Sequence, residues 1–231
     1  MMGRFRAVIL STLMVVGLAS QAGAESQLHI LAMGDSLMAS HRISGRAISN
    51  ALGKALGVKV TDRSVMGARH IYKLPITGSL GLKIARQYRK GNWDWIVMNG
   101  GGNDLWFGCG CNRCDRKMDR LISENGKSGE IPKLLNKLRK TGAKIAYVGY
   151  LRSPGVNSPI ENCKDEGDEL ERRIGDFAQK VDGVYFVSLA DLVPYGDTSF
   201  HGADMIHPSR KASSAIGRRV AQTILQAERK N

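Results

Sequence analysis

The chain has 231 residues, which is enough for one domain with a sizeable hydrophobic core but not comfortably enough for two. Its formal net charge of +13 would give an electrostatic attraction to an anionic membrane or polysaccharide, although the solvated surface of a basic protein is the preferred explanation. The Lys and Arg residues are spread along the chain without an aromatic-interleaved cluster or a recognisable nucleic-acid motif, which argues against a nucleic-acid partner.

The first 24 residues have the layout of an export signal. Arg4 and Arg6 give a positive start, an apolar core follows, and Ala22-Gly23-Ala24 supplies the small residues of a cleavage site. We predict a signal peptide over residues 1–24 and one mature domain over residues 25–231, with a net charge of +11 and a periplasmic or secreted location. The alternative is an uncleaved membrane anchor, which the shortness of the apolar core disfavours.

The mature sequence repeats a short apolar run followed by a longer segment with helical spacing, which is typical of an α/β protein with a parallel sheet. Each run is short, as expected for internal strands that are covered on both faces. The five predicted strands are Leu28–Ala32, Val58–Thr61, Trp95–Met98, Lys144–Val148 and Val184–Val187.

Apolar residues three and four positions apart predict crossover helices between these strands. A helix over Leu82–Arg89 is less clear, because Gly78 and Gly81 weaken its start. The clearer helices are predicted over Ile43–Leu52, Ile131–Leu138, Asp165–Val181 and Ser209–Ala227.

Long loops are predicted after the third and fourth strands, at Gly100–Asp115 and Tyr150–Cys163. In open α/β sheets the ligand crevice lies beyond the carboxyl ends of the strands, so both loops should border the site. They hold the four cysteines of the chain, which are Cys109, Cys111, Cys114 and Cys163. An even number of cysteines in an exported chain predicts two disulfides, with Cys163 tied to the 109–114 cluster so that the two loops are stapled together. A structural four-thiolate zinc site is the alternative.

The first motif that carries chemistry is Gly34-Asp35-Ser36-Leu37, directly after the first strand. A Ser on a tight corner between strand and helix projects above the sheet, and the N–H groups of the helix start point toward any oxyanion that forms when it attacks an ester. Taken alone the motif is weak, because Ser or Asp at a helix start is commonly a plain N-cap.

Two further turns follow the second and third strands. Gly67 lets the backbone approach a ligand closely, although an ordinary turn also explains a glycine there. In Gly101-Gly102-Asn103-Asp104 the glycines would allow the Asn103 amide to be aimed at a developing negative charge, although Asn in a glycine-rich turn is commonly structural.

Near the end of the chain, Asp204 precedes His207 by three residues. A carboxylate at this spacing would hold one ring nitrogen and leave the other to take a proton, with Pro208 ending the turn before the last helix. The pattern is commonplace by itself. His201 lies three residues before Asp204, so the three side chains could also form a metal site, but the serine motif accounts for two of them more fully.

Taken together and in this order, the four motifs resemble the SGNH hydrolases, also called the GDSL esterase/lipase family, over nearly the whole mature chain. The resemblance implies a flavodoxin-like three-layer α/β/α fold with a central five-stranded parallel sheet. It also implies that Ser36 is the nucleophile, His207 the base and Asp204 the carboxylate that orients the base. The implied oxyanion hole consists of Ser36, Gly67 and Asn103.

The resemblance implies an exported serine esterase that works through an acyl-enzyme without a metal or an organic cofactor. The substrate stays open among short-chain acyl esters, lysophospholipids, thioesters and acetylated sugars. The alternatives are a periplasmic acyltransferase that modifies a glycan and a non-catalytic exported binding protein on the same fold. Two departures from the family pattern are Asp62, where an Asn is frequent, and the cysteine-rich run of residues 109–114, so the pocket rim cannot be transferred.

Other polar residues are candidates for the crevice or for the scaffold. Arg69 and Arg152 would favour an anionic substrate if they face the crevice, although solvated loop charges are the commoner explanation. His41 and His70 are also placed at the crevice, whereas His29 falls inside the first predicted strand and is interpreted as structural.

Two aromatic residues next to Asn103 have two equally good interpretations. Trp106 and Phe107 would either bind an acyl chain or a sugar ring, or pack into the core.

Overall fold

Five parallel strands form one sheet in the part of the chain that the computed structural model describes, residues 27–156 and 158–230. The strand order is β2-β1-β3-β4-β5, so the order reverses between β1 and β3, where ligands bind in open α/β sheets. The strands are β1 (Ile30–Met33), β2 (Val60–Asp62), β3 (Trp95–Met98), β4 (Lys144–Val148) and β5 (Val184–Val187). The predicted signal peptide of residues 1–24 lies outside the described residues.

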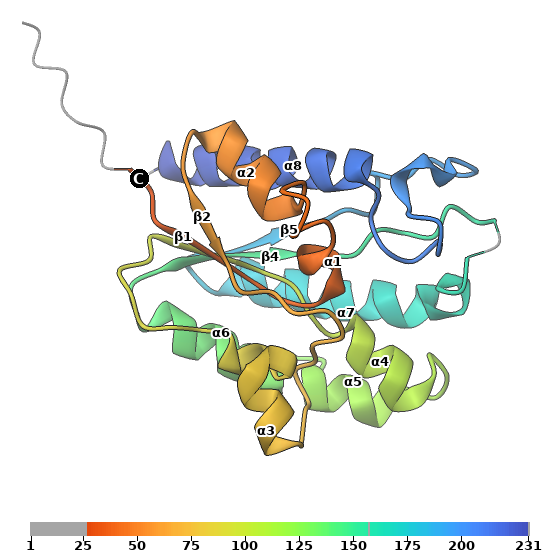
Figure 1. Ribbon diagram of the computed structural model, residues 1–231. Coiled ribbons are helices and arrows are strands. Elements are labelled where there is room, and N and C mark those ends of the chain that lie inside the picture. Colours follow the sequence, from red (N-terminus) through yellow and green to blue (C-terminus); the bar gives the residue numbers. More distant parts are fainter. Residues whose placement is uncertain (1–26, 157, 231) are drawn as a thin grey trace, which may run out of the picture.

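Helices cover both faces of the sheet, which makes the three-layer α/β/α architecture that the resemblance implied (Figure 1). Helices α2 and α8 pack against each other on one face, and α6 and α7 lie on the other. The helices are α1 (Ser36–Ala39), α2 (Ile48–Leu56), α3 (Pro75–Thr77), α4 (Gly102–Cys109), α5 (Asp115–Leu121), α6 (Glu130–Arg139), α7 (Lys164–Lys180) and α8 (Arg210–Glu228). None of the helices within the described ranges has the length and apolar character needed to span a bilayer.

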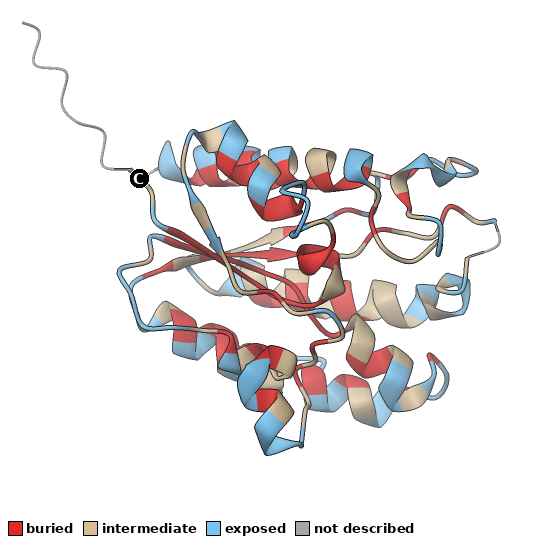
Figure 2. Cartoon of the chain, viewed as in Figure 1, coloured by how far each residue is buried: buried red, intermediate tan, exposed pale blue. Residues whose placement is uncertain are grey.

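The central strands β1 and β3 are apolar on both faces because each face of the sheet has its own core (Figure 2). Along β1, Ile30 and Ala32 pack with the residues of α2 and α8, whereas Leu31 and Met33 pack with those of α6 and α7. All four residues of β1 are buried, and so are all four of β3, as expected for strands at the centre of a doubly covered sheet.

The last three predicted strands have the predicted bounds, but the first two begin two residues later than predicted. His29 lies before β1, not inside it, and its ring is largely exposed beside Asp94, with Nδ1 3.4 Å from a carboxylate oxygen. The interpretation of His29 as a residue inside the first strand was therefore wrong. The prediction included Leu28 because it is apolar, but the pairing of β1 with its neighbouring strands begins only at Ile30.

Three predicted segments are also corrected. Ile43 is fully exposed, because a turn at residues 40–45 delays the start of α2 until Ile48. The segment Leu82–Arg89 forms no α-helix, since Gly81 has φ +108° and only a 3₁₀ turn follows at Ile84–Arg86. The segment Gly100–Asp115 is not one long loop, because α4 begins directly after its glycines.

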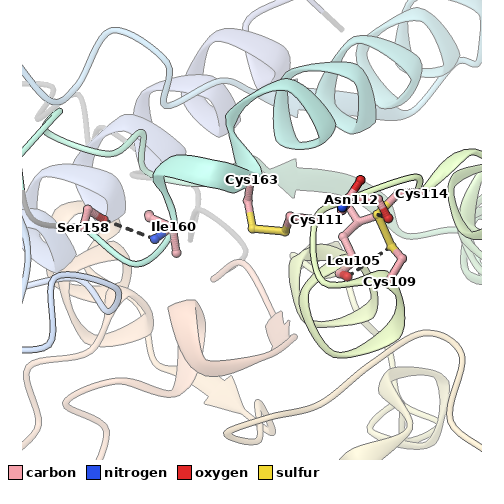
Figure 3. The surroundings of a disulfide bond; sticks show 8 residues. All are labelled: Leu105, Cys109, Cys111, Asn112, Cys114, Ser158, Ile160 and Cys163. Carbon is pink, nitrogen blue, oxygen red and sulfur yellow. Dashed lines mark hydrogen bonds between the residues drawn. A yellow bond between two sulfur atoms is a disulfide. The ribbon is translucent and has the colours of Figure 1, made fainter.

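The four cysteines form two disulfide pairs, in agreement with the predicted tie between Cys163 and the 109–114 cluster (Figure 3). Cys109 pairs with Cys114 across the end of α4, and Cys111 pairs with Cys163 at the start of α7. No group of three His, Cys, Asp or Glu side chains within residues 27–156 and 158–230 is arranged to hold a metal ion. The Cys111–Cys163 pair links the segment after β3 to the segment after β4, whereas the Cys109–Cys114 pair closes a local loop.

The two pairs should differ in their effect on stability because they close loops of different length. Cys111 and Cys163 are 52 residues apart, whereas Cys109 and Cys114 are 5 apart. Chain entropy predicts a loss of about 4 kcal/mol in the free energy of unfolding for Cys111→Ser with Cys163→Ser, and about 2 kcal/mol for Cys109→Ser with Cys114→Ser. Urea unfolding of both double variants measures this, and equal or reversed losses would contradict it.

Candidate functional site

Ser36 is the first residue of α1, on a tight corner that begins where β1 ends. Gly34 makes the corner possible, because its φ is +140° and a Cβ there would lie 1.9 Å from Asn99 Oδ1. Asp35 is the N-cap of α1, and its Oδ1 accepts a hydrogen bond from Leu37 N at 2.9 Å. The sequence therefore forms the strand-to-helix corner that the first motif predicted, with Ser36 half-buried at its tip.

The carboxyl group of Asp35 connects this corner to the ends of β3 and β4. Asn99 Nδ2 donates to Asp35 Oδ1 at 2.8 Å, and Asp35 N donates to Asn99 Oδ1 at 3.0 Å. The hydroxyl of Tyr150 donates to Asp35 Oδ2 at 2.5 Å. Burial raises the pKa of Asp35, while the hydrogen bonds from Tyr150, Asn99 and Leu37 and the nearby His207 act in the opposite direction.

Tyr150 continues this connection into the third motif. Its hydroxyl oxygen accepts a hydrogen bond from Gly102 N at 2.9 Å, so one oxygen bridges Asp35 and the first residue of α4. The backbone N–H of Tyr150 donates to the buried Glu171 at 2.6 Å. Burial, and then the negative charge of Asp35, raises the pKa of Tyr150, which keeps the hydroxyl protonated as a donor.

The second and third motifs lie side by side. Asn103 Nδ2 donates one hydrogen bond to Ala68 O at 3.2 Å, which leaves the second amide hydrogen for another acceptor. Gly67, next to Ala68, has φ +74°. Within the described ranges, neither the Ser36 N–H nor the Gly67 N–H donates to a protein acceptor. Three donors in two adjoining turns and one helix start are therefore available to an anion.

A buried carboxylate holds the turn after Gly67 in place. Asp104 Oδ2 accepts from His70 N at 2.9 Å, and Oδ1 accepts from Ile71 N at 2.8 Å. Burial raises the pKa of Asp104 to about 6, against the lowering effect of these two hydrogen bonds. The residue after Asn103 thus anchors the backbone that follows Gly67.

Asp204 and His207 form the predicted pair on an exposed turn before α8. Asp204 Oδ2 lies 2.5 Å from His207 Nδ1, and Oδ1 accepts from the backbone N–H groups of Ile206 and His207 at 3.1 and 3.0 Å. Burial acts to raise the pKa of Asp204, but these hydrogen bonds and the His207 ring outweigh it and lower the pKa to about 2. Asp204 therefore stays ionised and fixes the His207 ring through Nδ1.

The turn that carries His207 is tied to the segment after α1. His41 Nε2 lies 2.9 Å from Pro208 O, and both His41 and Met205 have left-handed backbone conformations, with φ of 63° and 56°. Such conformations are strained for residues other than Gly, so the surrounding contacts must hold them. His41 therefore supports the turn that carries His207. It does not line the crevice, which corrects the placement of His41 at the crevice in the sequence interpretation.

One cavity of about 490 Å³ brings the motifs together at the carboxyl end of the sheet. Ser36, Asn103 and His207 all line it, whereas Gly67 does not, although Ala68 beside it accepts a hydrogen bond from Asn103. Ser36 Oγ and the His207 ring form no hydrogen bond with each other in this part of the structure. Much of the remaining wall is apolar, and its apolar residues include Leu105, Trp106, Cys111, Leu151, Ile160, Cys163, Leu170, Tyr195 and Ile206.

The Arg and Lys side chains of the cavity wall are already paired with carboxylates. Arg152 donates to both oxygens of Glu171, at 2.8 and 3.0 Å, and lies 2.7 Å from Asp168. Lys164 lies 3.1 Å from Asp168. Arg152 faces the crevice as predicted, but its charge is neutralised, so it is neither a free anion site nor a solvated loop charge.

Of the other residues that the sequence suggested for the crevice, one lines the cavity and several do not. Trp106 lines it, whereas Phe107 is exposed on the outer side of α4. Arg69 stacks over Tyr72 away from the cavity. His70 is buried beneath the site against Tyr147, and burial lowers the pKa of His70 to about 3. His70 does not line the crevice, which corrects its placement there. Arg69 does not line the crevice either, so the crevice alternative for Arg69 is not supported.

His201 is not part of a metal site with Asp204 and His207. It is buried, neither ring nitrogen has a hydrogen-bond partner within the described residues, and burial lowers the pKa of His201. The predicted roles of Ser36, Gly67, Asn103, Asp204 and His207 stay predictions, now with the geometry given above.

Sequence reasoning missed the residues that connect the motifs. Asn99, Tyr150 and Glu171 are far apart in the chain and belong to no motif. The available signal was position: Asn99 follows β3 and Tyr150 follows β4, at the edge where ligands bind.

Comparisons with known proteins point to one family. The model of the GDSL-like lipase/acylhydrolase family matches residues 32–214. A protein of Slackia heliotrinireducens classed as an SGNH hydrolase superposes with a TM-score of 0.59 at 17% identity, covering 86% of this chain and 99% of that one. A comparison with curated proteins finds no match.

Two carbohydrate esterases are also similar in fold. One is the carbohydrate esterase family 2 enzyme of Corynascus thermopiles with its carbohydrate-binding domain. It superposes with a TM-score of 0.60 at 15% identity, and the match covers 87% of this chain and 66% of the esterase chain. The acetyl xylan esterase Est2A of Butyrivibrio proteoclasticus has a TM-score of 0.55 at 15% identity, covering 87% and 64%. At these identities the similarity shows the fold alone.

The bridge through Tyr150 gives a prediction about stability. Tyr150→Phe leaves a buried oxygen of Asp35 and the N–H of Gly102 without a partner, so the free energy of unfolding should fall by roughly 1–3 kcal/mol. The control is Tyr185→Phe, which removes a hydroxyl that makes no hydrogen bond in the described structure. Urea unfolding of both variants measures the effect, and equal stabilities would contradict a structural role for the bridge.

Proposed function

Because the chain belongs to the GDSL-like lipase/acylhydrolase family, we propose that it hydrolyses carboxylic esters with Ser36 as nucleophile, His207 as base and Asp204 as the carboxylate that orients His207. The observation that carries this proposal is one cavity lined by both Ser36 and His207, with the His207 ring held by Asp204. The hydrolysis of esters is taken from the activity of the family. The residues and the substrate class are our proposals.

In the proposed reaction, His207 Nε2 takes the proton of the Ser36 hydroxyl as Oγ attacks the ester carbonyl. Asp204 bound at Nδ1 leaves Nε2 as the only free ring nitrogen and stabilises the imidazolium that forms. The tetrahedral intermediate collapses to an acyl-enzyme as His207 returns the proton to the leaving alcohol. Water, deprotonated by the same nitrogen, then attacks the acyl-enzyme and releases the acid.

The oxyanion of each intermediate is assigned to three donors. They are the Ser36 N–H, the Gly67 N–H and the second amide hydrogen of Asn103. Support comes from the lack of an acceptor for any of the three among the residues that the structure describes, and from the hydrogen bond that aligns Asn103 with the turn beside Gly67. Donors that are fixed before the reaction stabilise the developing charge without reorganising.

We assign the cavity to an acyl group larger than acetyl. Its volume falls in the range of small-molecule sites, its wall is mostly aliphatic and aromatic, and its cationic side chains are paired with carboxylates. An acetylated sugar would leave most of this apolar wall in contact with water, and an anionic acyl group would find no free cation. The paired cysteines agree with the proposed export into an oxidising compartment.

The proposed nucleophile is tested with a fluorophosphonate probe. The purified protein should be labelled, and Ser36→Ala should not, because the probe phosphonylates an activated serine hydroxyl. Asn103→Ala should keep the labelling site and lose on the order of 10²–10³ in turnover of a nitrophenyl ester. Ser44→Ala, at an exposed serine of the following loop, is the matched control and should label like the wild type. Unlabelled wild type would contradict the proposal.

The acyl assignment is tested by filling the cavity. Gly167 lines it from α7, and a Cβ built there meets no atom within 4 Å, so Gly167→Phe should fold and occupy acyl space. In this variant, the nitrophenyl ester with the highest kcat/KM should have a shorter acyl chain than in the wild type. Hydrolysis of nitrophenyl acetate should be nearly unchanged. Gln179→Phe, at the exposed end of α7, is the control. An unchanged chain-length profile in Gly167→Phe would exclude this cavity as the acyl site.

A further inference from the structure

The positive charge of the protein is concentrated in one part of the chain because acidic residues are missing there. Residues 36–93 contain eleven Lys or Arg residues and one acidic residue, Asp62, so this quarter of the chain carries +10 of the total charge of +13. Within residues 27–156 and 158–230, none of the eleven cations forms an ion pair with a carboxylate. By contrast, arginines elsewhere, such as Arg152, Arg173 and Arg219, are paired.

These residues lie around the β2 edge of the sheet and extend onto both of its faces. They run from α1 through α2, the edge strand β2 and the projecting segment around α3, before the chain enters the sheet again at β3. Figure 1 shows α3 projecting from the body of the domain, on the face of the sheet opposite α2 and α8.

The projecting segment also exposes aliphatic side chains. Leu74, Ile76 and Leu80 are 64%, 77% and 75% exposed, and no residue of α3 is buried (Figure 2). Lys73 and Lys83 flank them. Large aliphatic side chains that gather at a projecting point mark an interaction site more often than single exposed ones do.

We propose that residues 73–90, here called the basic projection, bind the surface of an anionic lipid bilayer. Exposed aliphatic side chains flanked in sequence by Lys73 and Lys83 match the interface of a bilayer, where acyl chains lie directly beneath anionic headgroups. A polysaccharide or a nucleic acid would engage the cations and leave Leu74, Ile76 and Leu80 in water. A second copy of the chain would bring two strongly positive surfaces together, which electrostatic repulsion opposes.

Cosedimentation with vesicles tests this proposal independently of any esterase activity. The probe is a vesicle of phosphatidylcholine with 30% phosphatidylglycerol, compared with phosphatidylcholine alone at 0.1 M salt. The protein is used after its N-terminus has been determined, so that an uncleaved leader cannot supply the binding. The wild type should bind the anionic vesicles at least tenfold more tightly than the neutral ones.

Two variants separate the apolar from the charged contribution. Leu74→Ser with Ile76→Ser and Leu80→Ser should weaken binding tenfold or more, and the exposure of all three side chains should leave the melting temperature unchanged. Lys73→Gln with Lys90→Gln should weaken it by roughly fivefold per charge. The matched control, Arg116→Gln with Lys127→Gln, removes two exposed cations outside the basic projection and should bind nearly as the wild type does.

Three results would overturn the proposal. One is wild-type binding that does not depend on phosphatidylglycerol. Another is a triple serine variant that binds like the wild type, which would mean that charge alone acts and that a soluble polyanion fits equally well. The third is a control variant that loses as much affinity as Lys73→Gln with Lys90→Gln, which would mean that net charge and not this surface is responsible.

Discussion

The buried carboxyl group of Asp35 is the interaction on which the candidate site depends. Its two oxygens accept hydrogen bonds from Leu37 N, Asn99 Nδ2 and the Tyr150 hydroxyl, which come from α1, the end of β3 and the end of β4. In a low-dielectric surrounding each of these hydrogen bonds is strong, and a lost partner is costly. One side chain therefore fixes the relative positions of three turns that are far apart in the sequence.

The rest of the site divides into a rigid floor and a more exposed rim. On the floor, Asp35 and Asp104 are buried carboxyl groups whose partners hold the turns of Ser36, Gly67 and Asn103. On the rim, Asp204 and His207 lie on a partly exposed turn. Oxyanion donors must not move during the reaction, whereas the base has to approach both Ser36 and water, so this division suits the proposed chemistry.

The sequence could predict the fold class and the motifs because these depend on local patterns. Buried strands appear as apolar runs, and the strand-to-helix corner at Ser36 needs the glycine that precedes Asp35. The sequence could not predict the partners of Asp35, because Asn99 and Tyr150 are 64 and 115 residues away and only the sheet brings them close. His70 was misplaced for the same reason, since nothing nearby in the sequence shows that Tyr147 covers it. Strand starts and the helix near Ile43 were misplaced because apolar residues also occur in turns.

A crystal structure of the protein after reaction with a short phosphonate ester tests the proposed site most directly, because the phosphonyl oxygen stands in for the oxyanion. The prediction is a bond from Ser36 Oγ to phosphorus, with the phosphonyl oxygen at roughly 2.7–3.1 Å from the Ser36 N–H, the Gly67 N–H and Asn103 Nδ2. His207 Nε2 should then lie within hydrogen-bond distance of an oxygen on the same phosphorus. An adduct on Ser36 whose phosphonyl oxygen meets none of the three donors, or an adduct on another residue, would contradict it.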